Sequence, residues 1–263
     1  MDPALRTSAS GMMAQQTRIE VIANNLANVN TTGFKRSRAH FEDLLYQTVQ
    51  GATAAGDQGV EALPGVQIGR GTRLAAVRRM DGQGAIAPTG RPLDLAVEGD
   101  GYFQVELPNG SMAYTRDGSF SLSDQGSLVT SGGYAVVPGV NLPGEPGRIA
   151  ISTTGVVSFQ AEANGGEPIE IGRVELARFT NPTGLEALGE NLLSETSASG
   201  PALVGFPQDS GFGRVLSGAL EASNVEIVQE MVDMIAALRA YEIGSRALQS
   251  SEEMSQITAQ LGR

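Results

Sequence analysis

Apolar residues in the first thirty positions recur with the period of an α-helix. Leu5, Met12, Ile19 and Leu26 follow one another at intervals of seven residues, and Ile22 widens the stripe that they form. A seven-residue apolar period is typical of a helix that packs against another helix. We expect this helix to extend from about residue 4 to residue 29, which at 1.5 Å per residue makes it roughly 39 Å long.

The expected end of this helix is rich in asparagine. Asparagine side chains compete for backbone hydrogen bonds, and the glycine that follows them tolerates the left-handed conformation common at helix C-termini. Four asparagines within seven residues exceed what one helix end uses. Two interpretations therefore stand side by side, a helix terminus alone and a site of cross-chain hydrogen bonding. The residues of this signature turn are Asn24, Asn25, Asn28, Asn30, Gly33 and Phe34.

The last forty residues contain a second and longer amphipathic pattern. Ser223 and Asn224 can cap the start of a helix, and Glu226 and Glu230 suit its positive first turns. A helix over residues 224–261 would be about 57 Å long, far longer than an average globular helix. It would overhang a small β domain, so pairing with the N-terminal helix as a coiled coil is the economical arrangement. Its broad apolar face includes Val228, Val232, Ile235, Leu238, Tyr241 and Leu248.

Between the two helices the apolar period changes to two. Short alternating runs begin near residue 67 and are separated by pairs such as Asp100-Gly101, Asn109-Gly110 and Gly132-Gly133. Such pairs supply the positive φ of tight hairpin turns. Closely spaced strands without intervening helices indicate an antiparallel β domain. The predicted fold class is therefore α+β, with N- and C-terminal helices that pair as a coiled coil and a central Gly-rich antiparallel β domain.

We predict five segments in chain order. The segment between the first helix and the β domain includes a low-bulk excursion at about residues 46–66, and long loops of this kind are usually functional or disordered. The β domain is expected to be soluble as a fragment of residues 67–215. The segments are an N-terminal helix of an inner core (1–33), a linker with the excursion (34–66), the β domain (67–200), a return segment (201–222) and a C-terminal helix of the inner core (223–263).

The distribution of charge favours pairing of the two ends. The formal net charge of −11 argues against a nucleic-acid partner. Residues 1–40 carry a net charge of +3, however, and residues 221–263 carry −4. Opposite charges favour contact between the two terminal helices over contact of each with its own kind. Chance asymmetry is the alternative explanation.

Two further patterns concern membranes and export. No run of about 18 apolar residues occurs, so we expect no direct membrane insertion. The first residues lack both the basic start and the apolar stretch of a cleaved signal peptide. If the protein leaves the cytoplasm, we expect a route without such a peptide.

Residue types that carry catalysis or bind metals are scarce. The chain has no cysteine and one histidine, His40, which excludes Cys-ligated metals and an HExxH zinc site. No GxxxxGK[ST] phosphate loop occurs either. We predict no catalytic residue, no metal and no cofactor. A secreted β-rich carbohydrate-active enzyme is a remote alternative, and it would have to use the clustered carboxylates Asp94, Glu98 and Asp100.

Two stretches resemble the signatures of one protein family. ANNLANVNTTGFKR, at residues 23–36, and SNVEIVQEMVDMIAALRAYEIGSRAL, at residues 223–248, are similar to the N- and C-terminal signatures of the axial proteins of the bacterial flagellum. That family comprises rod, hook and hook-associated proteins. LPGVQIGRGTR, NPTGLEALGENL and the overall length resemble its distal-rod branch, and the resemblance covers nearly the whole chain. A proximal-rod or hook subunit is the alternative within the family.

The resemblance implies a structural subunit of the flagellar basal body, spanning the periplasm and exported unfolded. By resemblance, the terminal helices of many copies form an inner tube around the export channel, and the β domains form the outer wall of a rigid drive shaft. The excursion would brace neighbouring subunits. The implied partners are further copies of the chain, other rod proteins, the hook protein, the rod cap, the L- and P-ring bushing and the export apparatus. Apolar helical stripes without an intrachain core agree with burial by neighbours.

Overall fold

The protein is an α+β chain with one long helix at each end and antiparallel sheets between them, which confirms the predicted class. The computed structural model describes residues 3–50, 66–140, 147–161 and 167–261. The chain divides into two compact units that are each assembled from separate parts of the sequence. Unit 1 consists of Met1–Leu26, Ser37–Arg78 and Ile227–Arg263, and unit 2 of Ala27–Arg36 and Arg79–Glu226.

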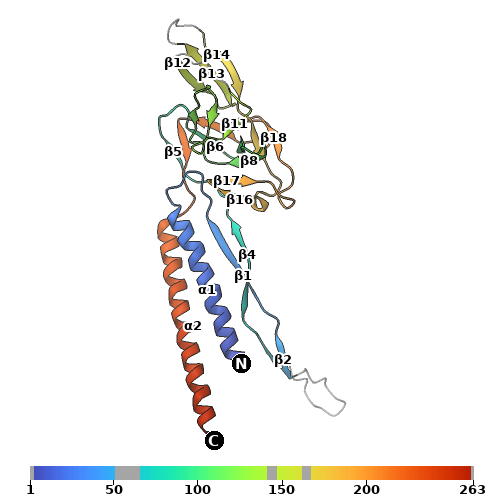
Figure 1. Ribbon diagram of the computed structural model, residues 1–263, viewed down its shortest axis with the longest axis vertical. Helices are drawn as coiled ribbons and strands as arrows, with labels where there is room; N and C mark the ends of the chain where they lie inside the picture. The colour runs from blue at the N-terminus through green and yellow to red at the C-terminus, as the bar shows by residue number, and fades with distance from the viewer. Residues whose placement is uncertain (1–2, 51–65, 141–146, 162–166, 262–263) are drawn as a thin grey trace, which may run out of the picture. The chain divides into compact units, whose positions relative to one another are not determined.

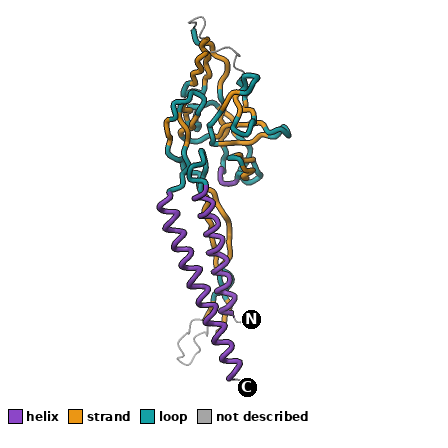
Figure 2. The backbone as a smooth tube through the Cα atoms, turned by 60° about the vertical axis from the view of Figure 1, so that its left-hand side comes forward, coloured by secondary structure: helices purple, strands orange, loops and turns teal. Residues whose placement is uncertain are grey.

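Unit 1 contains the two helices, which lie side by side in both views (Figures 1 and 2). Helix α1 covers Pro3–Ala27, and helix α2 covers Ile227–Leu261. Helix α1 begins at a proline, which the first helical position tolerates because its N–H would have no partner there. It ends inside the asparagine-rich stretch, as predicted.

Unit 1 also contains two small sheets. Strand β1 (Ser37–Asp43) pairs with β4 (Thr72–Arg79), and β2 (Gln47–Gln50) pairs antiparallel with β3 (Val66–Ile68). Three of these strands lie in or touch the segment predicted as a linker. Half-buried and exposed residues alternate along the first part of β1. Its sequence contains several charged residues, so the hydrophobic pattern did not indicate a strand there. Residues 51–65, which make up most of the predicted excursion, lie outside the described residues.

Unit 2 is built on a nine-stranded antiparallel sheet. Its order is β16-β17-β8-β7-β11-β10-β9, and β15 pairs with both β7 and β18. Predicted glycine turns close its hairpins: Gly110 and Gly133 have φ of +78° and +84°, which only glycine adopts without strain. The strands are β7 (Tyr102–Glu106), β8 (Met112–Thr115), β9 (Ser121–Leu122), β10 (Leu128–Val129), β11 (Ala135–Val137), β15 (Leu176–Arg178), β16 (Glu186–Gly189), β17 (Leu192–Ser194) and β18 (Leu203–Gly205).

Three smaller sheets complete unit 2. They bring residues that are far apart in sequence together, because β6 pairs with β19 and β5 pairs with β20. The third sheet has the order β12-β13-β14. A 3-10 turn, η1, occupies Pro182–Gly184. The strands are β5 (Ile86–Pro88), β6 (Leu95–Glu98), β12 (Gly147–Ile151), β13 (Val156–Ala161), β14 (Ile169–Arg173), β19 (Arg214–Ser217) and β20 (Ala219–Glu221).

The core of unit 2 is apolar and joins the large sheet to the smaller ones. Phe103 and Phe120 meet edge to face at its centre, with ring centroids 5.1 Å apart. Full burial of one such side chain contributes about 1.5–3 kcal/mol. Further members of the cluster are Leu95, Val97, Val105, Leu128, Val157, Val174, Leu176 and Val215.

Candidate assembly interface

The apolar residues predicted for α1 are covered within unit 1. Ile22 is buried, and Leu5, Met12, Ile19 and Leu26 are half-buried. Helix α1 has neighbours of its own chain on more than one side. It lies beside α2, and its Ser10 hydroxyl accepts a hydrogen bond from the backbone N–H of Thr72, at the start of β4. The N-terminal stripe therefore has an intrachain partner.

The apolar residues predicted for α2 are mostly exposed instead. Val228 is 71% exposed and Ile235 is 49% exposed, and Val232, Leu238 and Tyr241 also face solvent. Leu248 is half-buried. Large apolar side chains that recur along one helix face at i, i+4 and i+7 form a stripe suited to packing against another helix. We call the exposed set Val228, Met231, Val232, Ile235 and Leu238 the outer stripe.

The covered face of α2 lies opposite the outer stripe and consists of other residues. Ala237 is 1% exposed and Glu230 is buried, whereas Ile235 is half exposed. Residues that are two positions apart in a helix, such as Ile235 and Ala237, point about 200° apart around its axis. The two faces therefore point in opposite directions. A side chain added at Gly244 would lie 2.9 Å from Cγ of Met12 in α1, so this face of α2 meets α1 closely. The periodicity alone did not distinguish the two faces.

Polar contacts also join α1 to α2. Arg18 Nη2 lies 3.2 Å from Asp233 Oδ1, an ion pair with the signs that the charge distribution predicts. Nearer the end of α1, the buried Asn25 donates from Nδ2 to Glu230 Oε2 at 3.1 Å. Because both partners of this second contact are buried, it restricts how the two helices can slide along each other.

Asn25 also organises the chain that follows the signature turn. Its Nδ2 donates to the carbonyl oxygen of Ser37 at 2.9 Å, and its Oδ1 accepts from the Ser37 N–H at 2.8 Å. Asn28 accepts a hydrogen bond from the Thr31 hydroxyl within the turn. These two asparagines thus have intrachain roles. Cross-chain hydrogen bonding by the exposed Asn24 and Asn30 stays a prediction.

The second half of the signature turn is fixed inside unit 2. The Gly33 N–H donates to the carbonyl oxygen of Glu221 at 2.8 Å. Gly33 has φ of +67°, and a side chain there would lie 2.7 Å from the carbonyl carbon of Arg116. Both the conformation and the close approach require glycine. The half-buried Phe34 accepts the N–H of Asn224 at its carbonyl oxygen.

A buried ion network lies behind this turn. Lys35 Nζ donates to Glu221 Oε1 at 2.5 Å and to the carbonyl oxygen of Gly82 at 2.8 Å, and the side chains of Lys35 and Glu221 are 4% and 0% exposed. Glu221 Oε1 also accepts the Gly84 N–H at 2.8 Å. Arg116 Nη1 lies 3.6 Å from Glu221 Oε2. Burial lowers the pKa of the Lys35 ammonium group, and the hydrogen bond that this group donates to Glu221 opposes that shift.

Sequence reasoning missed the ion network. Lys35 directly follows the signature turn, and Glu221 lies in the predicted return segment of residues 201–222, so neither was predicted to be buried. One signal was available, because Lys35 is the only lysine beside seventeen arginines. A compact ammonium group donates in three directions and fits a small buried site that a planar guanidinium does not.

The role predicted for Asn224 is wrong. Helix α2 begins at Ile227, and Asn224 does not cap it. Its side chain instead accepts the Arg36 N–H at 2.7 Å and donates to the carbonyl oxygens of Met80 and Gly82 at 2.8 and 2.9 Å. Asn224 therefore ties the last residues of unit 2 to its first ones.

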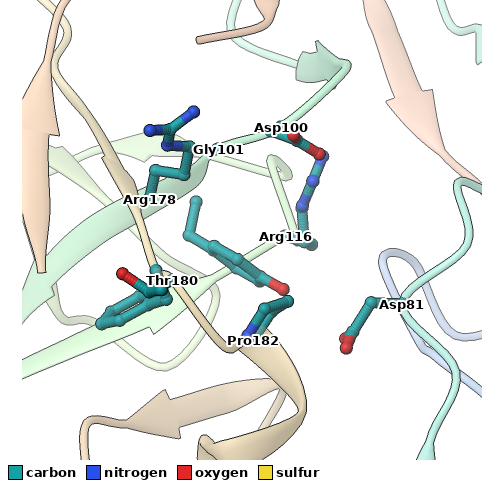
Figure 3. A pocket seen from close by; sticks show the side chains of 9 residues that line it. Asp81, Asp100, Gly101, Arg116, Arg178, Thr180 and Pro182 are labelled. Carbon is teal, nitrogen blue, oxygen red and sulfur yellow. The ribbon is translucent and has the colours of Figure 1, made fainter. Parts of the chain in front are cut away.

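Unit 2 also has a pocket of about 400 Å³ (Figure 3). Asp100, Arg116, Arg178 and Asp81 line it, together with the ring of Tyr102. The Arg116 guanidinium lies over that ring, 4.9 Å from its centroid, and also donates to the carbonyl oxygens of Val97 and Gly99. Burial raises the pKa of the Tyr102 phenol.

Two carboxylates of the enzyme alternative, Asp94 and Glu98, have structural partners, and the third, Asp100, lines the pocket. Asp94 is buried and accepts from the Thr89 hydroxyl at 2.6 Å, with Arg91 at 3.1 Å. Glu98 pairs with Arg214 at 2.7 Å. Among the described residues, no group of three or more His, Cys, Asp or Glu side chains is placed to hold a metal ion. Neither described helix is long and apolar enough to cross a membrane.

Fold and surface together define a structural assembly protein, because the outer stripe of a long terminal helix is left uncovered by the described part of its own chain. Comparison with known proteins agrees. Residues 5–35 match the family described as flagella basal body rod protein, residues 96–159 the flagellar hook protein FlgE/F/G D1 domain, and residues 216–261 the flagellar basal body rod FlgEFG protein C-terminal family.

Curated relatives match over the full length. The chain is 49% identical to the flagellar basal-body rod protein FlgG of Borreliella burgdorferi, over 99% of this chain and 98% of the relative. It is 47% identical to FlgG of Caulobacter vibrioides, over 98% of each chain, and 38% identical to FlgG of Bacillus subtilis, over 99% of each. The chain belongs to the family of flagellar basal-body rod proteins. It is a structural subunit of the rod in the flagellar basal body.

Proposed function

We propose that copies of this chain assemble into the distal rod of the flagellum, a rigid helical tube around the export channel that transmits torque from the motor to the hook. The FlgG relatives support the distal rod over the other positions in the family. Identity to FlgG of Caulobacter vibrioides is 47%, whereas identity to FlgF of the same organism is 34%. A proximal-rod or hook position is accordingly not favoured.

The observation that carries assembly is the exposed outer stripe of α2. In the free chain, its five large apolar side chains are each more than 40% exposed. A stripe of this kind is stabilised when a neighbouring subunit covers it, since burial of each such side chain contributes about 1.5–3 kcal/mol. A contact between two different surfaces whose rotation does not close into a ring propagates into an open helical polymer.

In the assembled rod, α1 and α2 pair as a coiled coil and form the inner core with the predicted seam residues. Unit 2 forms the outer wall. The excursion at about residues 46–66 braces neighbours. The partners are other copies of the chain, other rod proteins, the hook protein, the rod cap, the L- and P-rings and the export apparatus. The exposed outer stripe of α2 supports burial by neighbouring subunits, and family membership supports assembly with other rod and hook proteins.

The test is assembly of the purified full-length chain, followed by sedimentation velocity and electron microscopy as concentration rises. The wild type should form filaments. Ile235→Asp should remain monomeric, because it places a charge in a seam that becomes desolvated. Ala236→Asp is the matched control: it adds the same charge at an exposed neighbouring position about 100° around the helix. Filaments of Ile235→Asp at the wild-type concentration would refute the assigned seam.

A further inference from the structure

The contacts that close unit 2 are nested inside one another along the chain. Arg214 pairs with Glu98 across 116 residues, in the pair formed by β6 and β19. Further out, the Gly84 N–H reaches Glu221 across 137 residues, beside the pair formed by β5 and β20. Outermost, Lys35 reaches Glu221 across 186 residues. Each contact of longer range therefore encloses the shorter ones.

Nested contacts have a favourable order of formation. The entropic cost of closing a loop grows with the number of free residues in it, so long-range contacts form slowly unless earlier contacts shorten the loop. The pair β6–β19 removes most of the loop between Gly84 and Glu221. The pair β5–β20 then brings Glu221 to the edge where Lys35 must arrive.

The chemistry of the contact between Lys35 and Glu221 also favours its formation late in folding. Lys35 and Glu221 are nearly inaccessible to solvent in the finished structure. Removing two charges from water is costly until the groups that replace water are in position. Those groups belong to the part of unit 2 that the contact encloses: Arg116 is held by the carbonyl oxygens of Val97 and Gly99, at and just after β6.

We propose that the contact between Lys35 and Glu221 is a latch that closes unit 2 last, after the nine-stranded sheet and the pairs β6–β19 and β5–β20 have formed. Until the latch closes, residues 27–36 and 222–226 are not fixed on unit 2, although its core sheet is present. The chain thus has an open intermediate form whose completion requires residues close to its C-terminal helix. This proposal concerns folding of the single chain and does not depend on the proposed function.

The test is hydrogen exchange pulse-labelling of the full-length chain during refolding at a concentration below assembly. Peptides covering β7 and β8, residues 102–115, should become protected first. Peptides covering residues 28–36 and 222–226 should become protected together and later. Simultaneous or earlier protection of residues 28–36 would overturn the proposal.

A pair of variants gives an independent readout from kinetics. Glu221→Gln should speed unfolding by on the order of 100-fold and change the folding rate by less than about twofold, because the latch is absent from the transition state. Val105→Ala, in the fully buried core of β7, is the comparison, and it should slow folding. If Glu221→Gln slows folding in proportion to the stability lost, the latch forms early and the proposal is wrong. If Glu221→Gln does not fold, the pulse-labelling of the wild type still decides the matter.

Discussion

Glu221→Gln is the sharpest single test of what holds unit 2 together. The substitution keeps the size and shape of the side chain and removes its charge. Glutamine can still accept the Gly84 N–H and the Lys35 ammonium group at its amide oxygen, since both donate to Oε1 in the wild type. What is lost is the counter-charge for Lys35 and for Arg116, which lies 3.6 Å from Oε2.

The expected cost follows from burial. Removing one partner of a buried ion pair destabilises a protein by about 3–5 kcal/mol, because it leaves an uncompensated charge in the interior. Because Glu221→Gln retains the hydrogen bonds, it should lower the free energy of unfolding by about 3 kcal/mol. Glu221→Ala loses them, and its cost should lie at the upper limit of that range. A domain is typically stable by about 5–15 kcal/mol, so the loss is a large fraction of the total.

Equilibrium unfolding in urea, followed by far-UV circular dichroism of the unassembled full-length chain, measures this loss. The midpoint should fall while the slope with denaturant stays constant. Glu98→Gln is the matched control, because it makes the same chemical change in the exposed pair with Arg214, and it should change stability little. The variant Lys35→Met/Glu221→Leu, which removes both charges, should recover most of the stability. A loss below about 1 kcal/mol for Glu221→Gln would show that the buried network contributes no more than a surface pair, and the reasoning would be refuted.

Three further predictions follow from the two units. Leu26→Asp should block assembly as Ile235→Asp does, but it should also lower the thermal stability of the single chain because Leu26 is half-buried in unit 1; equal melting temperatures for both variants would contradict this. Gly33→Ala should destabilise unit 2 by at least about 1 kcal/mol more than Gly90→Ala, because both residues have positive φ but only Gly33 approaches neighbouring backbone; urea unfolding of both variants measures the difference. Burial lowers the pKa of Lys35, which is also close to Glu221, Arg116 and Asp81. The free energy of unfolding of the wild type should therefore rise relative to that of Lys35→Met as pH increases from the lowered pKa to 10.5. A difference between the two proteins that stays constant across that range would contradict this prediction.

The helices and the hairpin turns could be predicted because their signals are local. A repeat of seven residues marks a helix wherever it occurs, and Asn109-Gly110 supplies a tight turn without reference to the rest of the chain. The division of roles between the helices could not be predicted in the same way. Ile22 and Ile235 have the same pattern in sequence, but one is covered within its own chain and the other is exposed.

The boundaries of unit 2 depend on long-range contacts, so they could not be predicted from local patterns in the sequence either. The contact between Lys35 and Glu221 spans 186 residues, and neither residue interrupts a local pattern. The fragment of residues 67–215, expected to be soluble by itself, lacks Lys35 and Glu221 of the ion network, and it also lacks Gly33. A fragment of residues 27–226 includes all of them and is the better design for studying unit 2 in isolation.

The ion pair between Lys35 and Glu221 joins the short first segment of unit 2, residues 27–36, to the end of its long second segment, residues 79–226, so the first and last residues of the unit lie near each other. A unit whose two ends meet can be inserted into another without stretching either, as successful domain insertions show. The β unit is accordingly a cassette within the helical part of the chain. Evolution can enlarge, shrink or exchange such a cassette while the flanking helices keep their sequence.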